Sequence, residues 1–277
     1  MSSTHSVSIG GVPEYFNLPI HLAIENGTFL EAGVDAHWQE VPEGTGAMVR
    51  ALANDELDLA VVLTEGMVQS ISKGNPAQIV HVYVQSPLLW GIHVPARSPF
   101  VALEDLVGKR FAISRYGSGS HLMAILWAQN QHWGEHLEAL AFEVVNNLQG
   151  ARSAMMNGVA EIFLWEKYTT QFLVDNGEFR RLGVFPTPWP CFVVAASGKA
   201  LKEKPDDVVA CLDVLTQATR DFNAREDRVE MIVSRFGLDR ADVNDFLPQT
   251  HWTTEKTLPQ GVIQQVSEAL KKAGLLS

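Results

Sequence analysis

Hydrophobic positions in residues 1–88 change repeatedly between the short apolar runs of strands and the three-to-four-residue spacing of helices. This alternation predicts a strand–helix order that begins and ends with a strand. Short strands joined through helices pair in parallel, so the segment predicts an α/β unit with helices on both faces of its sheet. The predicted strands are residues 6–10, 36–41, 57–63 and 78–85, and the predicted helices are residues 19–26, 45–54 and 65–73.

Residues 89–189 repeat the same order. Apolar runs predict strands at residues 90–94, 110–114, 142–145 and 161–165, and helical spacing predicts helices at residues 118–131 and 149–156. One more strand is expected at residues 191–196, after a proline-rich turn. Beyond it the pattern is helical, with predicted helices at residues 205–223, 225–236, 240–246 and 258–273.

The long helices at the end of the chain add no strands, so we expect them to pack back onto the first unit. The prediction is a two-lobed α/β fold in which each lobe is a mainly parallel sheet flanked by helices. Residues 1–88 and 190–277 form lobe I, and residues 89–189 form lobe II. The chain crosses between the lobes near residues 87–91 and again near residues 186–191. Two strand-like crossings make a hinge of the kind that accompanies closure on a ligand.

Charge and composition exclude several classes of partner. The net charge of −11 and the scattered lysines and arginines argue against nucleic acid. No apolar run approaches the roughly 20 residues of a membrane-spanning helix, so direct membrane insertion is not expected. The first residues show no signal peptide, so we expect a cytoplasmic location, or a periplasmic one if an export signal precedes this chain. Cys191 and Cys211 are expected to be buried free thiols.

Four segments carry a resemblance to a known family. Residues 22–35 read LAIENGTFLEAGVD, residues 51–60 read ALANDELDLA, residues 103–110 read LEDLVGKR, and residues 117–120 read GSGS. These segments resemble the motifs of the type II periplasmic-binding-protein fold. The most similar branch holds the thiamine-pyrimidine-precursor, sulfonate, taurine and nitrate binding proteins of ABC transporters. The resemblance spans residues 7–215.

The resemblance implies a venus-flytrap protein that closes two lobes on a small organic ligand and works with an ABC permease. The same family includes cytosolic enzymes of pyrimidine-precursor synthesis, which use a cysteine-rich strand. The corresponding stretch here, residues 188–194, holds one cysteine, Cys191. The resemblance therefore favours a binding protein over an enzyme.

In open α/β sheets the ligand lies beyond the carboxyl ends of the strands, next to helix N-termini. This rule selects residues after each predicted strand and beside the second crossing. The predicted ligand-binding residues are Tyr15, Phe16, Gly44, Thr45, Gly46, Thr64, Glu65, Ser118, Gly119, Ser120, Trp165, Glu166 and Trp189.

Two kinds of ligand fit these residues. The glycine-flanked helix starts at Thr45 and Ser118 offer backbone amides and hydroxyls to an anionic group, although the same residues serve equally as N-caps. Glu65 and Glu166 suit an amine or a protonated ring nitrogen, which nearby aromatic rings also bind. Glu166 is alternatively a solvated helix start, and the tryptophans are alternatively core residues.

Two other motifs match catalytic patterns only in part. His132-Trp-Gly-Glu-His136 matches a zinc-protease spacing, but Gly134 interrupts it where a helix should end. Ser118 and Ser120 are too close in sequence to His121 to face it as nucleophile and base. We therefore expect no catalytic residue, no metal and no cofactor.

The sequence predicts a small-molecule binding protein whose ligand is a nitrogen heterocycle or an amine-bearing metabolite. An enzyme of thiamine-type or menaquinone-type cofactor biosynthesis on the same fold is the alternative. A ligand sensor that docks a partner through its helical end is the third reading.

Overall fold

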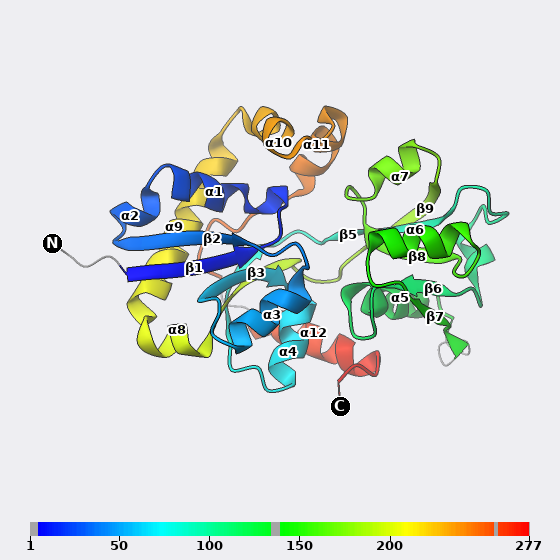
Figure 1. Ribbon diagram of the computed structural model, residues 1–277, viewed down its shortest axis with the longest axis horizontal. Coiled ribbons are helices and arrows are strands. Elements are labelled where there is room, and N and C mark those ends of the chain that lie inside the picture. The colour runs from blue at the N-terminus through cyan, green and yellow to red at the C-terminus, as the bar shows by residue number, and fades with distance from the viewer. Residues whose placement is uncertain (1–4, 134–138, 258–259, 277) are drawn as a thin grey trace. The chain divides into compact units, whose positions relative to one another are not determined.

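The computed structural model describes residues 5–133, 139–257 and 260–276. The chain divides into two compact units (Figure 1). Met1–Ser86 and Trp189–Ser267 form the first unit, and Pro87–Pro188 and Glu268–Ser277 form the second. The division runs through the last helix, α12 (Gln260–Lys272), whose final turns belong with the second unit.

The first unit is built on a five-stranded mixed sheet in the order β2-β1-β3-β10-β4. β1 pairs in parallel with β2 and β3, whereas β10 is antiparallel to both β3 and β4. Ile9 of β1, residues 59–62 of β3 and all of β10 are buried, because both faces of these strands are covered. The strands are β1 (His5–Gly11), β2 (Val34–Glu40), β3 (Leu59–Leu63), β4 (Gln78–Val84) and β10 (Phe192–Ala196).

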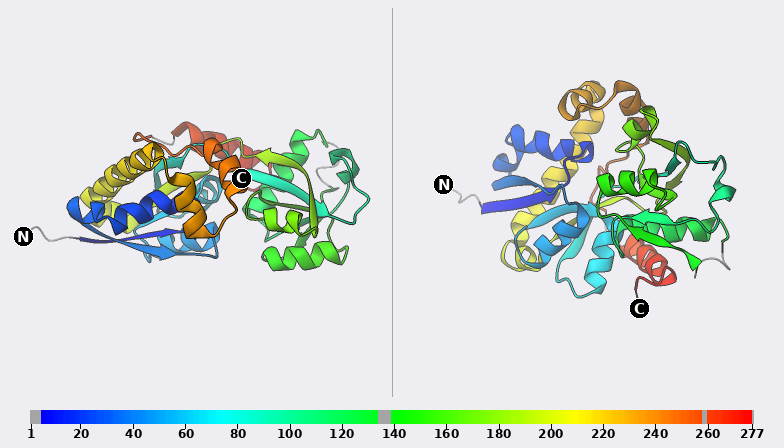
Figure 2. Two further views of the ribbon diagram at one scale, coloured as in Figure 1. Left: turned by 90° about the horizontal axis from the view of Figure 1, so that it is seen from above. Right: turned by 45° about the vertical axis from the view of Figure 1, so that its right-hand side comes forward.

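Helices cover both faces of this sheet. α1 (Leu18–Glu25), α2 (Thr28–Glu31) and α9 (Pro205–Ala224) lie on one side, and α3 (Thr45–Ala53) and α4 (Thr64–Ser72) lie on the other (Figures 1 and 2). A right-handed crossover from each parallel strand to the next produces this arrangement. The remaining helices of the unit are η1 (Tyr15–Asn17), α8 (Gly198–Glu203), α10 (Arg228–Phe236), α11 (Arg240–Phe246) and η4 (Leu247–Gln249).

The second unit repeats the pattern of the first, with the strand order β7-β6-β8-β5-β9. β6 pairs in parallel with β7 and β8, and β5 is antiparallel to β8 and β9. Its elements are β5 (Leu89–Pro95), η2 (Leu103–Leu106), β6 (Phe111–Ile113), α5 (Gly119–Asn130), β7 (Phe142–Val144), α6 (Leu148–Met156), β8 (Ile162–Glu166), α7 (Gln171–Asp175) and β9 (Phe179–Pro186).

The two faces of the second sheet pack against different helices. Phe111 contacts Trp127 of α5 with a centroid distance of 5.9 Å. Its neighbour Ala112 points the other way, into a cluster with Phe163 and with Ala151 of α6. Side-chain alternation along β6 therefore places α5 on one face and α6 on the other.

The predicted two-lobed α/β organisation is confirmed, and parallel pairing is less dominant than the patterns indicated. Each sheet has an antiparallel strand next to its third parallel strand, β10 in one unit and β5 in the other. The patterns also missed α2, α7, α8 and β9. Arg180, Arg181 and Gly183 interrupt the apolar alternation of β9, yet the strand forms because its backbone pairs with β5. Within the described residues, no helix combines the length and apolar character needed to cross a membrane.

A buried histidine joins three strands of the second unit. His93 on β5 is fully buried, and its Nδ1 donates to the carbonyl of Phe163 at 3.2 Å. Its Nε2 lies 3.1 Å from the Thr170 hydroxyl and accepts from Nε of Arg181 at 3.4 Å. Burial and the Arg181 charge lower the pKa of His93 from 6.5 to about 4, against hydrogen bonds that raise it. The ring is therefore neutral in the folded protein at neutral pH.

We predict that this histidine makes the protein less stable in weak acid. Between pH 6.5 and about 4 the unfolded chain binds a proton at His93 that the folded chain does not, so stability falls as the pH falls. The expected slope is up to about 1.4 kcal/mol per pH unit. Urea unfolding of wild type and His93→Asn at several pH values measures it. Equal slopes in the two proteins would contradict the assignment.

Candidate functional site

The carboxyl end of the first unit's sheet collects several loops at one edge. β1, β2 and β3 are parallel, so the loops that follow them lie together. β10 is antiparallel, so its first residues lie at the same edge. The predicted site residues of this unit all lie in these loops or in the first turns of the helices that follow them: Tyr15, Phe16, Gly44, Thr45, Gly46, Thr64, Glu65 and Trp189.

Glu65 is a buried carboxyl group in the first turn of α4. Its Oε2 accepts a hydrogen bond of 2.9 Å from Nε1 of Trp189, whereas its Oε1 has no partner among the described residues. The residue is 3% exposed. Burial raises the pKa of the carboxyl group, against hydrogen bonds from its own backbone and from Trp189 that lower it. The group is held towards its neutral form, with one oxygen left for a further polar partner.

Thr64 ties the end of β3 to the segment before β10. Its amide donates to the carbonyl of Cys191 at 3.0 Å, and its hydroxyl donates to the carbonyl of Pro190 at 2.5 Å. Thr64 is fully buried, and both of its donors are used within the protein. Thr64 therefore positions Glu65 and Trp189, and a direct ligand contact by Thr64 remains a prediction.

The start of α3 differs from the expected capping arrangement. Gly44 is the N-cap residue, with φ 77° and ψ −165°, a conformation that is essentially restricted to glycine. Thr45 does not cap its own helix, because its hydroxyl accepts a 3.2 Å hydrogen bond from the amide of Leu63 at the end of β3. A Cβ on Gly66 would lie 2.4 Å from Cγ2 of Thr45. The first turns of α3 and α4 therefore start in close contact.

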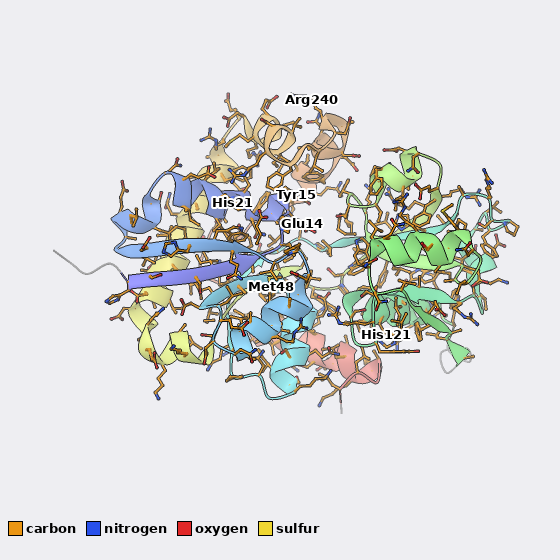
Figure 3. The ribbon with its side chains drawn as sticks, viewed as in Figure 1. Glu14, Tyr15, His21, Met48, His121 and Arg240 are labelled. Carbon is orange, nitrogen blue, oxygen red and sulfur yellow. The ribbon has the colours of Figure 1, made fainter. Side chains whose placement is uncertain are left out.

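Tyr15 and Phe16 belong to an aromatic cluster at the end of β1. The ring of Tyr15 stacks on Phe246 with centroids 4.0 Å apart, and Figure 3 shows Tyr15 beside Glu14. The carbonyl of Phe16 accepts hydrogen bonds from Tyr83 Oη at 2.9 Å and Trp252 Nε1 at 2.8 Å. Both residues are buried, so packing accounts for most of their surface.

Sequence reasoning missed a buried asparagine and a buried indole nitrogen at this edge. Asn17 is fully buried, with Nδ2 bonded to the Val12 carbonyl at 2.8 Å and Oδ1 without a partner among the described residues. Nε1 of Trp38 is likewise unpartnered there. A Cβ on Gly11 would lie 2.2 Å from Cη2 of Trp38 and 2.9 Å from Nδ2 of Asn17. The consecutive glycines Gly10 and Gly11 are the sequence signal for this close approach.

The second unit gathers its own predicted residues at the corresponding edge of its own sheet. β6 and β8 end there, and β5, which is antiparallel, begins there. The residues are Ser118, Gly119, Ser120, Trp165 and Glu166.

Ser118 caps α5 and belongs to a hydroxyl cluster. Its Oγ accepts a 3.3 Å hydrogen bond from the amide of His121 and lies 3.1 Å from Oγ of Ser120. Oγ of Ser120 also accepts from the Ser114 amide at 3.0 Å. Nδ1 of His121 accepts from the Gly117 amide at 3.0 Å, and burial lowers the pKa of this imidazole. These bonds pair the ring with backbone and not with a serine hydroxyl, as the sequence spacing predicted; Figure 3 labels His121.

Glu166 and Trp165 occupy the last two positions of β8. Glu166 Oε2 accepts from the amide and hydroxyl of Thr169 at 2.6 and 2.8 Å. Burial raises the pKa of Glu166, against these hydrogen bonds and the charge of Arg181. Trp165 is half-buried and stacks on Phe163 with centroids 5.3 Å apart. Its ring therefore has a packing role as well as an accessible part.

The strand register places Trp90, at the start of β5, beside these residues. It lies directly opposite Glu166 on β8 and opposite Phe185 on β9. Side chains of opposed residues stand on the same face of a sheet. The indole Nε1 of Trp90 is buried without a partner among the described residues. Two aromatic rings and a carboxyl group therefore form one row across three strands.

The structure offers no metal site or reactive thiol within the residues it describes. No group of histidine, cysteine, aspartate and glutamate side chains there is arranged to hold a metal ion. The zinc-like motif at 132–136 extends into residues 134–136, which lie outside the described residues. Cys191 and Cys211 are both buried and unpaired. Burial raises the pKa of the Cys211 thiol to about 12 and that of Cys191 well above its usual value.

Comparison with known proteins gives one family match and many similar structures. A family model described as Ca3427-like PBP matches residues 90–185. The CA3427 gene product of Candida albicans, described as defining a new family with the generic periplasmic binding protein fold, is 26% identical. Its TM-score is 0.88, over 98% of this chain and 91% of that one.

Two sulfonate-binding proteins are similar at lower identity. The alkanesulfonate-binding protein SsuA of Xanthomonas axonopodis pv. citri, bound to MOPS, has a TM-score of 0.77 and 19% identity, covering 98% of this chain and 94% of that one. The aliphatic sulphonate binding protein SsuA of Escherichia coli has a TM-score of 0.71 and 17% identity, covering 98% and 88%. A search of curated proteins found no match.

We predict that the Thr64 hydroxyl stabilises the first unit. Thr64→Val keeps the side-chain shape and removes the donor to the Pro190 carbonyl, which should cost about 1–3 kcal/mol of unfolding free energy. Thr28→Val is the matched control, because no hydrogen bond of the Thr28 hydroxyl is recorded among the described residues, and it should change stability by less than about 0.5 kcal/mol. Urea unfolding at pH 7 compares them, and equal losses would contradict the role given to Thr64.

Proposed function

Because the chain has the periplasmic-binding-protein fold that its motifs predicted, we propose that it is a solute-binding protein for a small organic molecule. The observation that carries the proposal is Glu65, a buried carboxyl group at the carboxyl edge of a sheet with one oxygen lacking any partner among the described residues. A buried polar atom without a partner is costly in a folded protein. A ligand that bonds to it relieves that cost at the edge where α/β sheets bind ligands.

The charge of the first unit's edge supports an amine or a nitrogen heterocycle as the ligand. The segments 11–17, 41–46, 64–66, 85–86 and 189–191 contain the glutamates Glu14, Glu43 and Glu65, and no lysine, arginine or histidine. A sulfonate, the ligand class for which the two SsuA proteins are named, would find no cationic side chain in these segments. A cationic nitrogen finds the carboxyl group of Glu65 and the ring of Trp189 instead.

We propose that the second unit contributes to the same ligand, as the sequence prediction of two closing lobes requires. The row of Phe185, Trp90 and Glu166 offers aromatic faces and a carboxyl group, and the start of α5 offers Gly119 and the hydroxyls of Ser118 and Ser120. A planar, nitrogen-containing molecule matches both sets, because aromatic rings bind its faces and carboxyl groups bind its N–H groups.

The role we propose is that of the ligand-binding component of an import system, with an ABC permease as its partner and the periplasm as its location. Structural neighbours support this role: they include SsuA proteins and a ligand-binding component of an ABC-type import system from Staphylococcus aureus. A binding component needs only groups that complement its ligand, whereas an enzyme also needs a side chain activated as a nucleophile, acid or base. The inert thiol of Cys191 and the backbone-bonded His121 favour binding over chemistry.

A thermal-shift screen against amines, nitrogen heterocycles, sulfonates and carboxylates tests the proposal. We expect a nitrogen-containing solute to stabilise the protein, by about 2.7 kcal/mol at a hundred times its Kd. Mass spectrometry of the incubated solute should find it unchanged. Consumption of the solute would indicate the biosynthetic enzyme instead, and the absence of any stabilising solute would contradict solute binding.

Substitutions in the second unit test whether both units serve one ligand. Trp90→Leu should weaken binding of the best solute at least tenfold, because it removes the central ring of the row. Phe172→Leu is the matched control, since Phe172 is an exposed ring on α7 in the same unit and lies on none of the strands that form the row, and it should leave affinity unchanged. Isothermal titration calorimetry measures both. Equal affinities for wild type and Trp90→Leu would restrict the site to the first unit.

A further inference from the structure

The two oxygens of Glu65 have different surroundings, and this difference bears on which ligands the site accepts. Oε2 is fixed by Trp189 Nε1, so the orientation of the carboxyl group is set by a neutral donor. Oε1 receives no donor among the described residues. No lysine or arginine side chain is recorded within hydrogen-bond or ion-pair distance of either oxygen there. An ionised carboxylate in this position would be buried with only the neutral donors of Trp189 and of its own backbone, which are too little to replace its hydration.

The titratable neighbours of Glu65 do not supply the missing positive charge. The thiol of Cys191, at the start of β10, is buried, and the negative charges of Glu65 and of Glu14 both disfavour its ionisation. Glu14, in the loop after β1, is itself acidic. Within α4, the other residues of the first turns carry no charge. The titratable groups recorded around Glu65 are therefore neutral or negative. The unliganded protein favours a protonated Glu65.

We propose that Glu65 is a specificity-determining residue that selects a ligand with a positively charged nitrogen, by exchanging its own proton for an N–H group of that ligand. The proposal rests on the proposed function and names the charge class of its ligand. On binding, the O–H bond at Oε1 breaks and the proton passes to the buffer. The ligand N–H then donates to Oε1, while Trp189 keeps its hydrogen bond to Oε2. Since Glu65 is 3% exposed, the ligand reaches Oε1 only when side chains at this edge move.

The exchange gives each class of ligand a different dependence on pH. A cation binds the ionised form of Glu65, so its affinity rises with pH and levels off above the pKa of Glu65, which burial raises. The rise is up to about tenfold per pH unit, since one proton is released. An anion requires the protonated form, so its affinity falls as the pH rises. A neutral ligand that accepts a hydrogen bond from the protonated oxygen follows the anion.

Three probes that share a benzyl group test this selection: benzylamine, benzyl alcohol and phenylmethanesulfonate. Binding to the full chain is measured by isothermal titration calorimetry between pH 5 and pH 8. We expect benzylamine to bind more tightly than the other two, with an affinity that rises with pH. Titrations in phosphate and in Tris, whose ionisation enthalpies differ, should show that benzylamine binding releases up to one proton. This measurement needs no variant.

Two variants distinguish the effect of the Glu65 carboxyl group from the effect of the other acidic side chains at this edge. Glu65→Gln keeps the side-chain shape but cannot ionise, so benzylamine should lose at least tenfold in affinity and its dependence on pH. Glu43→Gln is the matched control, because Glu43 is an exposed carboxylate of the same edge. It should retain the dependence on pH and change affinity by less than about fivefold.

The proposal is overturned if benzylamine binds no more tightly than benzyl alcohol, if its binding takes up protons, or if Glu65→Gln retains the dependence on pH. These outcomes are distinct from failure of the proposed function. A solute that binds wild type and Glu65→Gln equally would leave solute binding standing and would remove only the charge selection by Glu65.

Discussion

The segment from Trp189 to Cys191 is fixed to the end of β3 by three hydrogen bonds, and the architecture of the first unit depends on them. Thr64 donates to the carbonyls of Pro190 and Cys191, and Trp189 donates to Glu65. This junction directs the returning chain into β10, between β3 and β4. The same residues that place the inner strand β10 also shape the candidate site, so fold and site share one set of contacts.

Much of the fold follows from local sequence patterns, because the hydrophobic periodicity is clear in this chain and the residues that end helices and strands are easily recognised. The helix at Arg240–Phe246 and the strand at 78–84 lie where the periodicity placed them, since apolar faces and turn residues agree there. β9 was missed because an edge strand with Arg180 and Arg181 lacks the apolar alternation of a central one. Its formation is decided by pairing with β5, a contact distant in sequence that no local pattern contains.

The candidate site was predictable in position and less so in detail. The rule that ligands lie beyond the carboxyl ends of strands identified the loops around Glu65 and Glu166. It did not show that the Thr45 hydroxyl serves β3 instead of its own helix, because that bond joins residues 18 positions apart. Nor did it find Asn17, whose unpartnered amide oxygen is recognisable only from burial. Side-chain burial is a property of the assembled sheet and not of any single segment.

The position of β10 also bears on the order in which the chain folds during synthesis. β4 neighbours β10 and no other strand in its sheet, and β10 is not made until residue 196 has left the ribosome. The strands of the second unit all lie between residues 89 and 186, so the second unit's sheet can form completely while the first unit's sheet still lacks β10. Most strands of the first unit's sheet are thus translated first, although that sheet is completed after the sheet of the second unit. Until then β3 and β4 expose unpaired strand edges, to which a chaperone of nascent chains can bind.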